Sequence, residues 1–411
     1  MKVLLAHPGT QYSARLAQQL ARVQVLGAFH TGIAIAEGGF LQGLLPWLPR
    51  RLRRKLLNRR VGGVPAGSVR LHVVDEALAL LSLRMGGEAQ AVFHRRNGRF
   101  QRGIADAEIR AADAVIGFDT SGWILAQSCR AAGVPFVLDQ SIGHPASMAR
   151  EYDKLRARYP GWSHHAQPRL PVVARAEEME HELAARIVVA SSFTRATLVD
   201  NGIAADRIRI NPYGVDCSQF RPRTGSAAAV MRFVFVGSVS VRKGVAQLLE
   251  VWRRLAPAKA ELWIVGPADK PAIAVLEGIA GVVYKGAVPH SELPMLLAQC
   301  DVFVFPSFFE GFALVILEAM ACALPVITTT ATAGPDIIEP GVSGWVLPPG
   351  DDEALAATME ACLRQPAANA QMGMQARMTA ERHTWDSYGA RWRAILDELP
   401  APGERLARPC S

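Results

Sequence analysis

The amino-acid sequence predicts an α/β fold with two doubly wound domains, and three observations support this prediction. At 411 residues the chain is too long for one ordinary hydrophobic core, so two domains of roughly 200 residues are expected. Short apolar runs alternate with helical stretches along the whole chain, which indicates parallel sheets covered by helices. Several of these runs end in a glycine-containing loop before the next helix, as the strands of a Rossmann-like domain do.

The first half of the chain opens with a strand, a loop and a helix. Residues 2–6 are the predicted strand, His7 to Thr10 the loop, and 12–22 the helix. Further strands are expected at 23–29, 70–74, 114–118, 136–139 and 186–190. Asp119 and His144 each follow one of these strands, where ligands of open α/β sheets bind, so both are candidate site residues. His164 and His165 are rivals of His144 for a catalytic role.

Residues 40–60 combine an apolar group with a basic cluster. The apolar side chains are Phe40, Leu41, Leu44, Leu45, Trp47 and Leu48, and the cations are Arg50, Arg51, Arg53, Arg54, Lys55, Arg59 and Arg60. This combination suits contact with an anionic membrane surface. A helix packed on its domain with a solvated basic face is an equal alternative. No RNA- or DNA-binding motif accompanies the net charge of +8, so nucleic acid is the weaker partner.

The composition favours a globular cytoplasmic protein, peripheral on the membrane at most. Half of the residues are apolar, yet no run of 18 apolar residues occurs, and Met1 and Lys2 lead directly into a strand. The six cysteines are scattered without a CxxC pair. They are therefore expected to be reduced thiols and not ligands of a zinc ion or members of a disulfide framework.

A linker is predicted at residues 217–230, where Pro222, Gly225 and Ser226 gather. This places an N-terminal domain at 1–216 and the start of a second domain at 231. The second domain opens with a strand at 232–236 and a loop from Gly237 to Gly244. Arg242 and Lys243 in this loop stand beside a predicted helix start, a combination suited to binding a diphosphate.

Residues 301–326 predict a strand, a glycine-containing loop, a helix over 312–322 and another strand. The free backbone N–H groups at such a helix start form an anion site. Glu310 lies in the loop and Glu318 in the second turn of the helix. Glu318 can then reach ribose hydroxyls while Glu310 faces the group beyond the phosphates. Taken alone, both could equally be ordinary surface acids.

These residues resemble the signature of the family 4 retaining glycosyltransferases, whose GT-B architecture has two Rossmann-like domains facing across a cleft. The matching residues are Pro306-Ser307, Glu310-Gly311-Phe312, Glu318-Ala319-Met320-Ala321 and Leu324-Pro325-Val326, together with Phe235-Val236-Gly237, Arg242-Lys243-Gly244, Gly341, Gly344 and Leu347. The resemblance covers residues 180–390 well and the first half of the chain loosely. It places the second domain at 231–384 and a last helix within 385–411 that crosses back onto the first domain.

The resemblance implies transfer of a sugar from a nucleotide-diphosphate donor to a glycan or lipid-linked acceptor, in polysaccharide or glycoconjugate biosynthesis. Glu310, His144 and Lys243 are the implied catalytic residues. The implied donor-binding residues are Gly237, Ser238, Arg242, Lys243, Gly311, Phe312, Ala313, Leu314 and Glu318, and the acceptor side is assigned to Gly9, Thr10 and Asp119. Ser238 stands where the family carries an arginine, and Arg242 is the nearest cation that could replace it.

Neither a cofactor nor a metal ion is expected, because no DxD-like carboxylate pair follows a strand and a cationic diphosphate site removes the need for a bridging metal ion. Two other functions remain open from the sequence. One is a sugar-nucleotide epimerase of the same architecture, which needs no acceptor, and the other is a non-catalytic nucleotide-binding scaffold. A dinucleotide oxidoreductase is weaker, since no GxGxxG follows the first strand.

Overall fold

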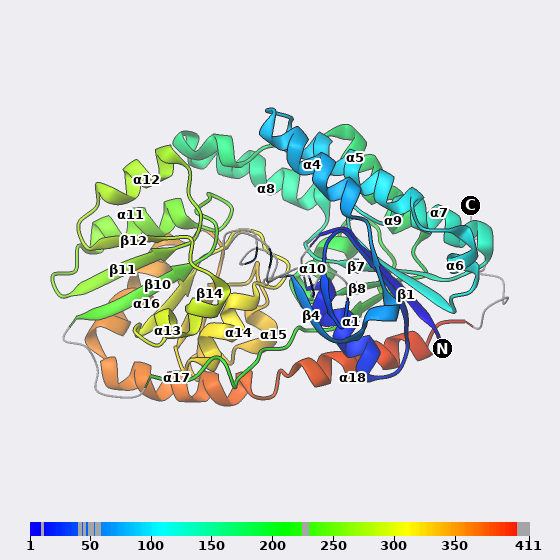
Figure 1. The fold of residues 1–411 in the computed structure, drawn as a ribbon. Coiled ribbons are helices and arrows are strands. Elements are labelled where there is room, and N and C mark those ends of the chain that lie inside the picture. Colours follow the sequence, from blue (N-terminus) through cyan, green and yellow to red (C-terminus); the bar gives the residue numbers. More distant parts are fainter. Residues whose placement is uncertain are drawn as a thin grey trace.

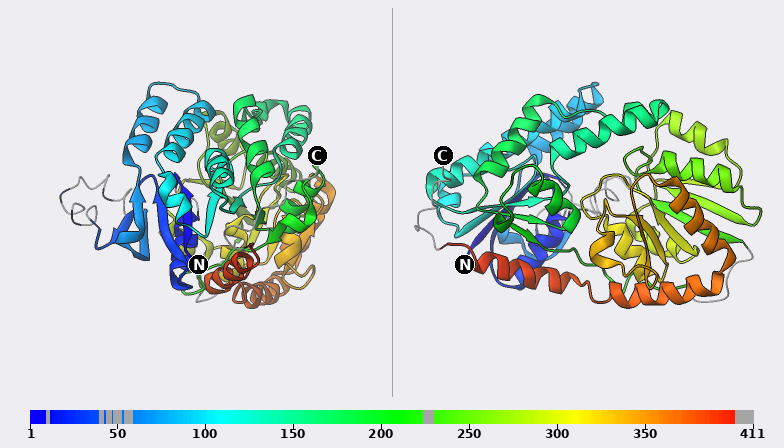
Figure 2. Two further views of the ribbon diagram at one scale, coloured as in Figure 1. Left: turned by 90° about the vertical axis from the view of Figure 1, so that its right-hand side faces the viewer. Right: turned by 180° about the vertical axis from the view of Figure 1, so that it is seen from behind.

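The computed structural model describes residues 1–9, 12–39, 43, 47, 53, 59–223 and 230–400. Two parallel sheets flanked by helices form two lobes (Figures 1 and 2). The N-terminal lobe is built on seven strands, from edge to edge β5 (Val69–Leu71), β2 (Leu26–Thr31), β1 (Val3–His7), β6 (Ala114–Phe118), β7 (Phe136–Gln140), β8 (Arg186–Val189) and β9 (Ile208–Ile210). A small extra sheet pairs β3 (Ile35–Glu37) with β4 (Arg60–Pro65).

The C-terminal lobe is built on six strands. Their order is β12 (Val282–Gly286), β11 (Ala260–Val265), β10 (Met231–Val236), β13 (Val302–Phe305), β14 (Val326–Thr329) and β15 (Gly344–Leu347). All four residues of β13 are buried, as expected for a central strand covered on both faces.

Helices fill the crossovers between these parallel strands. Those of the N-terminal lobe are α1 (Ser13–Arg22), α4 (Val73–Arg84), α5 (Ala89–Arg102), α6 (Asp106–Arg110), α7 (Trp123–Ala132), α8 (Pro145–Arg158), α9 (Pro171–Leu183) and α10 (Ser192–Val199). Those of the C-terminal lobe are α11 (Val245–Leu255), α12 (Lys270–Glu277), α13 (Leu293–Leu297), α14 (Leu314–Ala321), α15 (Gly334–Ile337), α16 (Asp352–Arg364) and α17 (Pro366–Ala380). Short 3-10 turns are η2 (Ala66–Ser68), η3 (Pro160–His165), η4 (Ala205–Arg207) and η5 (His290–Glu292).

The strand order reverses once in each large sheet, between β1 and β6 in one and between β10 and β13 in the other. Such topological switch points open a crevice at the carboxyl ends of the strands, where ligands bind. The loops that leave these strands carry Gly9, Asp119, the run 237–244 and Glu310. The fold therefore brings most of the predicted site residues to switch points.

The chain returns to the N-terminal lobe at its end. Helix α18 (Trp385–Asp397) lies along α1 (Figure 1). Its Asp386 forms an ion pair with Arg22 of α1. Arg391 Nε of α18 donates to Asn211 Oδ1 at 2.7 Å. The domain boundaries at 217–230 and 384 stay predictions.

Two expected elements differ from the structure. The strand predicted at 70–74 is cut short, because β5 ends at Leu71 and α4 begins at Val73 with Asp75 and Glu76 in its first turn, where the helix dipole favours acids. The helix predicted from 312 begins at Leu314, because Ala313 has a left-handed φ of 65°. Thr10 and most of 40–60 lie outside the described residues; Trp47 is 86% exposed. No helix among the described residues is long and apolar enough to cross a bilayer.

Candidate active site

The loop after β13 lies against the N-terminal lobe. A methyl group added at Gly311 would lie 1.8 Å from the carbonyl oxygen of Ser141, so only glycine permits this approach of the two backbones. The hydroxyl groups of Ser191 and Thr194 both donate to the Gly311 carbonyl oxygen, the second at 3.1 Å. The residue next to Glu310 is therefore held by the facing lobe.

Glu310 lies between two cations of the loop after β10. Its Oε2 is 2.9 Å from Lys243 Nζ and 3.1 Å from Arg242 Nη1. Burial by itself raises the pKa of Glu310, but the charges of Arg242 and Lys243 lower it to about 2. The carboxyl is thus ionised at neutral pH, and the three side chains together carry one excess positive charge, which favours an anionic ligand.

The loops after β10 and β13 touch each other. Gly244 has φ of 76°, and a methyl group there would lie 2.0 Å from the Pro306 carbonyl oxygen. The amide of Phe308 donates to the carbonyl of Arg242 at 2.8 Å, and Arg242 Nη1 also donates to the Phe309 carbonyl. Arg242 thus binds the loop of Glu310, while Gly237 and Ser238 begin the same loop directly after β10.

Glu318 is buried on α14, one turn after Leu314, and it has a partner that sequence reasoning missed. His290 Nε2, from the loop after β12, lies 2.7 Å from Glu318 Oε1. The hydrogen bond to Glu318 raises the pKa of His290. His290 follows a strand end of the same sheet, which is the one signal that could have pointed to it. Phe312 is buried, and its ring contacts that of Tyr213 at 5.0 Å between centroids.

His144 caps α8 on the facing lobe. Its Nδ1 accepts a hydrogen bond from the amide of Ala146 at 3.1 Å, and burial lowers the pKa of the imidazole. A methyl group added at the preceding residue, Gly143, would lie 2.6 Å from the ring of Phe309, which adjoins Glu310. The rival residues His164 and His165 lie elsewhere between the lobes, each with Nε2 2.8 Å from Asp269 Oδ2.

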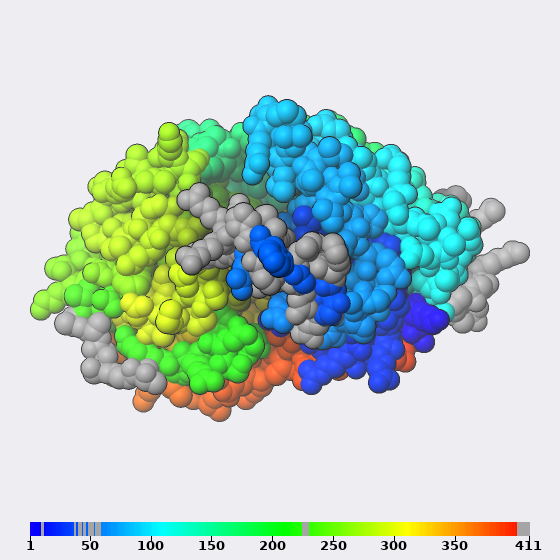
Figure 3. Space-filling model, viewed as in Figure 1, coloured from blue at the N-terminus to red at the C-terminus, as the bar shows by residue number. Residues whose placement is uncertain are grey.

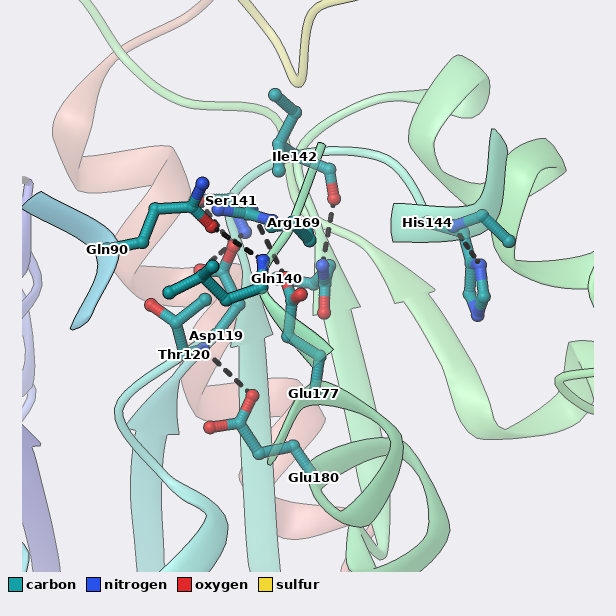
Figure 4. A network of polar contacts seen from close by, with 12 residues as sticks. Gln90, Asp119, Thr120, Gln140, Ser141, Ile142, His144, Arg169, Glu177 and Glu180 are labelled. Carbon is teal, nitrogen blue, oxygen red and sulfur yellow. Dashed lines mark hydrogen bonds and ion pairs between the residues drawn. The ribbon is translucent and has the colours of Figure 1, made fainter. Parts of the chain in front are cut away.

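Asp119 is buried beneath the loop that meets Gly311 (Figure 4). Its two carboxylate oxygens accept hydrogen bonds from the hydroxyl group of Ser141 at 2.8 Å and from its amide at 3.2 Å. Burial raises its pKa despite these bonds. Asp119 therefore fixes the conformation of the Ser141 loop.

Gly9, another residue predicted for the acceptor side, lies in the loop after β1, next to His7.

Helix α9 adds buried acids that sequence reasoning also missed. Glu180 accepts hydrogen bonds from the amides of Thr120 and Gly122, at 2.9 and 2.7 Å, and Glu177 lies 3.2 Å from Arg169 (Figure 4). The only signal of these acids in the sequence is the number of glutamates in residues 171–183. These bonds fix the loop after β6, which adjoins the site.

A cavity of about 500 Å³ lies between the lobes, beside the loop that follows β13. It is lined from the N-terminal lobe by α8 and α10, including Lys154 and Phe193, and from the C-terminal lobe by Phe308, Phe309 and Ala331. Glu310, Lys243, Arg242 and Gly311 lie together at the interface between the lobes, with Glu318 on the adjoining helix, and none of the five lines this cavity.

Comparison with known proteins identifies relatives of this site and fold. The family described as "Glycosyl transferases group 1" matches residues 231–365. The chain is 31% identical over 288 residues to the MMP alpha-(1->4)-mannosyltransferase of Mycolicibacterium hassiacum, covering 66% of this chain and 67% of that protein. It is 26% identical over 267 residues to the putative colanic acid biosynthesis glycosyltransferase WcaL of Salmonella typhimurium, covering 59% and 66%. The alignments thus span about two thirds of these relatives.

Solved structures share the architecture. HepE of Anabaena in complex with UDP and glucose has a TM-score of 0.65 at 16% identity, over 97% of this chain and 100% of that one. Sucrose-phosphate synthase of Thermosynechococcus elongatus has a TM-score of 0.67 at 19% identity, over 97% and 99%. At these identities the likeness concerns the fold alone, and it confirms the predicted pair of Rossmann-like domains in a GT-B arrangement.

Proposed function

This chain belongs to the group 1 glycosyl transferases and is a glycosyltransferase. From that premise we propose that it moves a sugar from a nucleotide-diphosphate donor to a glycan or lipid-linked acceptor, with retention at the anomeric carbon. Polysaccharide or glycoconjugate assembly is the proposed setting. The observation that carries the proposal is the Lys243–Glu310–Arg242 cluster, whose excess positive charge lies at a switch point between the lobes.

The diphosphate is proposed to lie between Lys243 and the start of α14, with Gly311, Phe312, Ala313 and Leu314 supplying backbone N–H groups. Lys243 and these groups would stabilise the negative charge that develops on the leaving diphosphate. Arg242 would act mainly as a positioning residue, because its guanidinium already donates to Phe309 and Glu310. Since Ser238 carries no charge, Lys243 would then be the main cation that binds the phosphates.

Glu310 is proposed to orient the donor sugar, since its low pKa keeps it an acceptor of hydroxyl hydrogen bonds at neutral pH. His144, Gly9 and Thr10 are proposed for the acceptor side. The approach of Gly311 to Ser141 would exclude water from the donor sugar and so limit hydrolysis.

Replacing Glu318 by glutamine is expected to weaken donor binding by about 1–3 kcal/mol, because ribose hydroxyls would lose a charged acceptor. Calorimetric titration measures the loss. Glu353→Gln, an exposed acid on α16, is the matched control and should bind donor as the wild type does. For a donor without ribose hydroxyls, Glu318→Gln and the wild type should bind alike. Equal losses for both donors would contradict the assignment to ribose.

A nucleoside diphosphate is expected to bind in the presence of EDTA. The excess positive charge of the Lys243–Glu310–Arg242 cluster would neutralise the diphosphate, as a bridging metal ion does in metal-dependent transferases. Titration of a panel of nucleoside diphosphates and nucleotide sugars tests this and also identifies the base and the sugar. Binding that EDTA abolishes and magnesium restores would overturn the proposal of a metal-independent donor site.

Peripheral attachment to an anionic membrane surface through residues 40–60 is proposed from their sequence, which would place the protein on the cytoplasmic face. Each arginine near such a surface contributes about 1 kcal/mol. A variant in which four of these arginines become glutamine is expected to float more weakly with anionic liposomes than the wild type. Unchanged flotation would instead mean that the segment packs on its domain.

A further inference from the structure

Helix α4 turns an apolar face to solvent. Val74, Leu78, Leu81 and Met85, the residue that caps it, are 71%, 46%, 52% and 74% exposed. Their spacing of three or four residues places them on one side of the helix. Monomeric soluble proteins seldom leave such a contiguous apolar ridge uncovered.

The opposite side of α4 is firmly anchored. Glu76 is buried, with Arg96 Nη1 2.9 Å from its Oε2 and Arg59 Nη2 3.1 Å from its Oε1. Ala79 is also buried, and α5 packs along α4. The helix is therefore held in place by buried contacts, and its exposed ridge is a fixed feature of the surface.

Arginines flank this ridge. Arg95, Arg99 and Arg102 are exposed on α5 at successive turns, and Arg84 is exposed at the end of α4. The nearby acids are engaged: Asp75 pairs with Arg99 at 3.2 Å, and Glu88 caps α5 by accepting from two backbone amides. The hairpin of α4 and α5 thus presents an apolar ridge with a net positive border.

The hairpin stands at the upper rim of the molecule (Figure 3). Its base adjoins the proposed acceptor side. A methyl group at Gly32 would lie 3.5 Å from Glu76 Oε2 and 2.5 Å from the carbonyl oxygen of Pro8, so the first turn of α4 neighbours the loop after β1. A surface bound to the ridge would therefore lie near that loop.

We propose that the α4–α5 hairpin docks on an anionic lipid bilayer, with Val74, Leu78, Leu81 and Met85 in the interface and the arginines on the headgroups. An amphipathic helix that combines an apolar face with flanking arginines binds bilayers in this way. A second copy of the chain fits less well, because a two-fold pairing of this face would bring like arginine stripes together. Docking here is distinct from the contact proposed for 40–60. Its role in presenting a lipid-linked acceptor rests on the proposed function.

The test compares two triple variants of the full chain, both with residues 40–60 intact. Val74→Ser, Leu81→Ser, Met85→Ser alters the ridge, and Met295→Ser, Met374→Ser, Met378→Ser alters side chains of similar exposure on the other lobe, at 68%, 53% and 49%. Sedimentation with vesicles of phosphatidylcholine and phosphatidylglycerol is expected to show about a hundredfold weaker binding for the ridge variant, given the apolar area removed, and wild-type binding for the control variant.

A ridge variant that sediments like the wild type would overturn the proposal. A wild-type protein that does not bind these vesicles would also overturn it. So would a wild-type protein that is a dimer in solution while the ridge variant is a monomer. Calorimetric titration with nucleoside diphosphates should be unchanged in both variants. If the wild type does not bind any nucleoside diphosphate, the proposed donor site is wrong. The vesicle sedimentation would still test the docking surface independently.

Discussion

Replacing Lys243 by alanine is expected to lower kcat/KM by about 10²–10³-fold, the usual cost of removing one preorganised charge stabiliser from an active site. Lys243 Nζ lies 2.9 Å from Glu310, and its loss leaves Arg242 as the only remaining cation of the cluster. Arg242 donates a hydrogen bond to the Phe309 carbonyl oxygen. It therefore cannot move onto a bound diphosphate unless this bond breaks and the loop after β13 is released. Affinity for the nucleoside diphosphate should fall with turnover.

Lys259→Ala is the matched control, since Lys259 is exposed and precedes β11 at the opposite end of the strands. Steady-state kinetics of the two variants, with the same donor and acceptor, measure the difference. If Lys243→Ala keeps the wild-type kcat/KM, the diphosphate is held by other groups and the proposed role of the cluster is wrong.

Replacing Gly311 by alanine is expected to lower kcat by about a hundredfold. The substitution would displace the loop of Glu310, and a displacement of about 1 Å of a catalytic group lowers the rate by that factor. The new methyl group would lie 1.8 Å from the Ser141 carbonyl oxygen, so the lobes cannot approach as they do in the wild type. Gly311 is not among the residues with left-handed φ, and its backbone therefore accepts alanine without strain of its own. The effect should fall on the interface and not on the stability of either lobe.

Gly67→Ala provides the control, because a methyl group there meets no atom within 4 Å and its φ is not left-handed. Small-angle scattering should show a larger radius of gyration for Gly311→Ala only, with nucleoside diphosphate binding retained. A fully active Gly311→Ala enzyme would mean that the contact with Ser141 has no part in turnover.

Much of the fold could be predicted because local patterns determine it. The strand of Val302–Phe305, the loop of Glu310 and the helix of Glu318 are specified by neighbouring residues, and the structure has each of them. The strand predicted at 70–74 was wrong in its second half, because the acids that begin α4 favour a helix there.

Contacts between distant segments could not be predicted in this way. His290, which follows β12, forms a hydrogen bond with Glu318 on α14. Asp119, which follows β6, accepts a hydrogen bond from Ser141, which follows the neighbouring strand β7. Such pairings depend on how the sheets order their strands, which no short spacing in the sequence specifies. The apolar ridge on α4 was hidden for the same reason, since its exposure depends on what packs against the helix.

We propose that this site transfers a sugar from a nucleotide-diphosphate donor. Release of nucleoside diphosphate, followed in EDTA with and without a glycan or lipid-linked acceptor, tests it most directly. The expected result is release that depends on the acceptor and is about 10²–10³-fold slower in Lys243→Ala. Release that is absent with every donor, or a donor sugar that is epimerised without any acceptor, would contradict it.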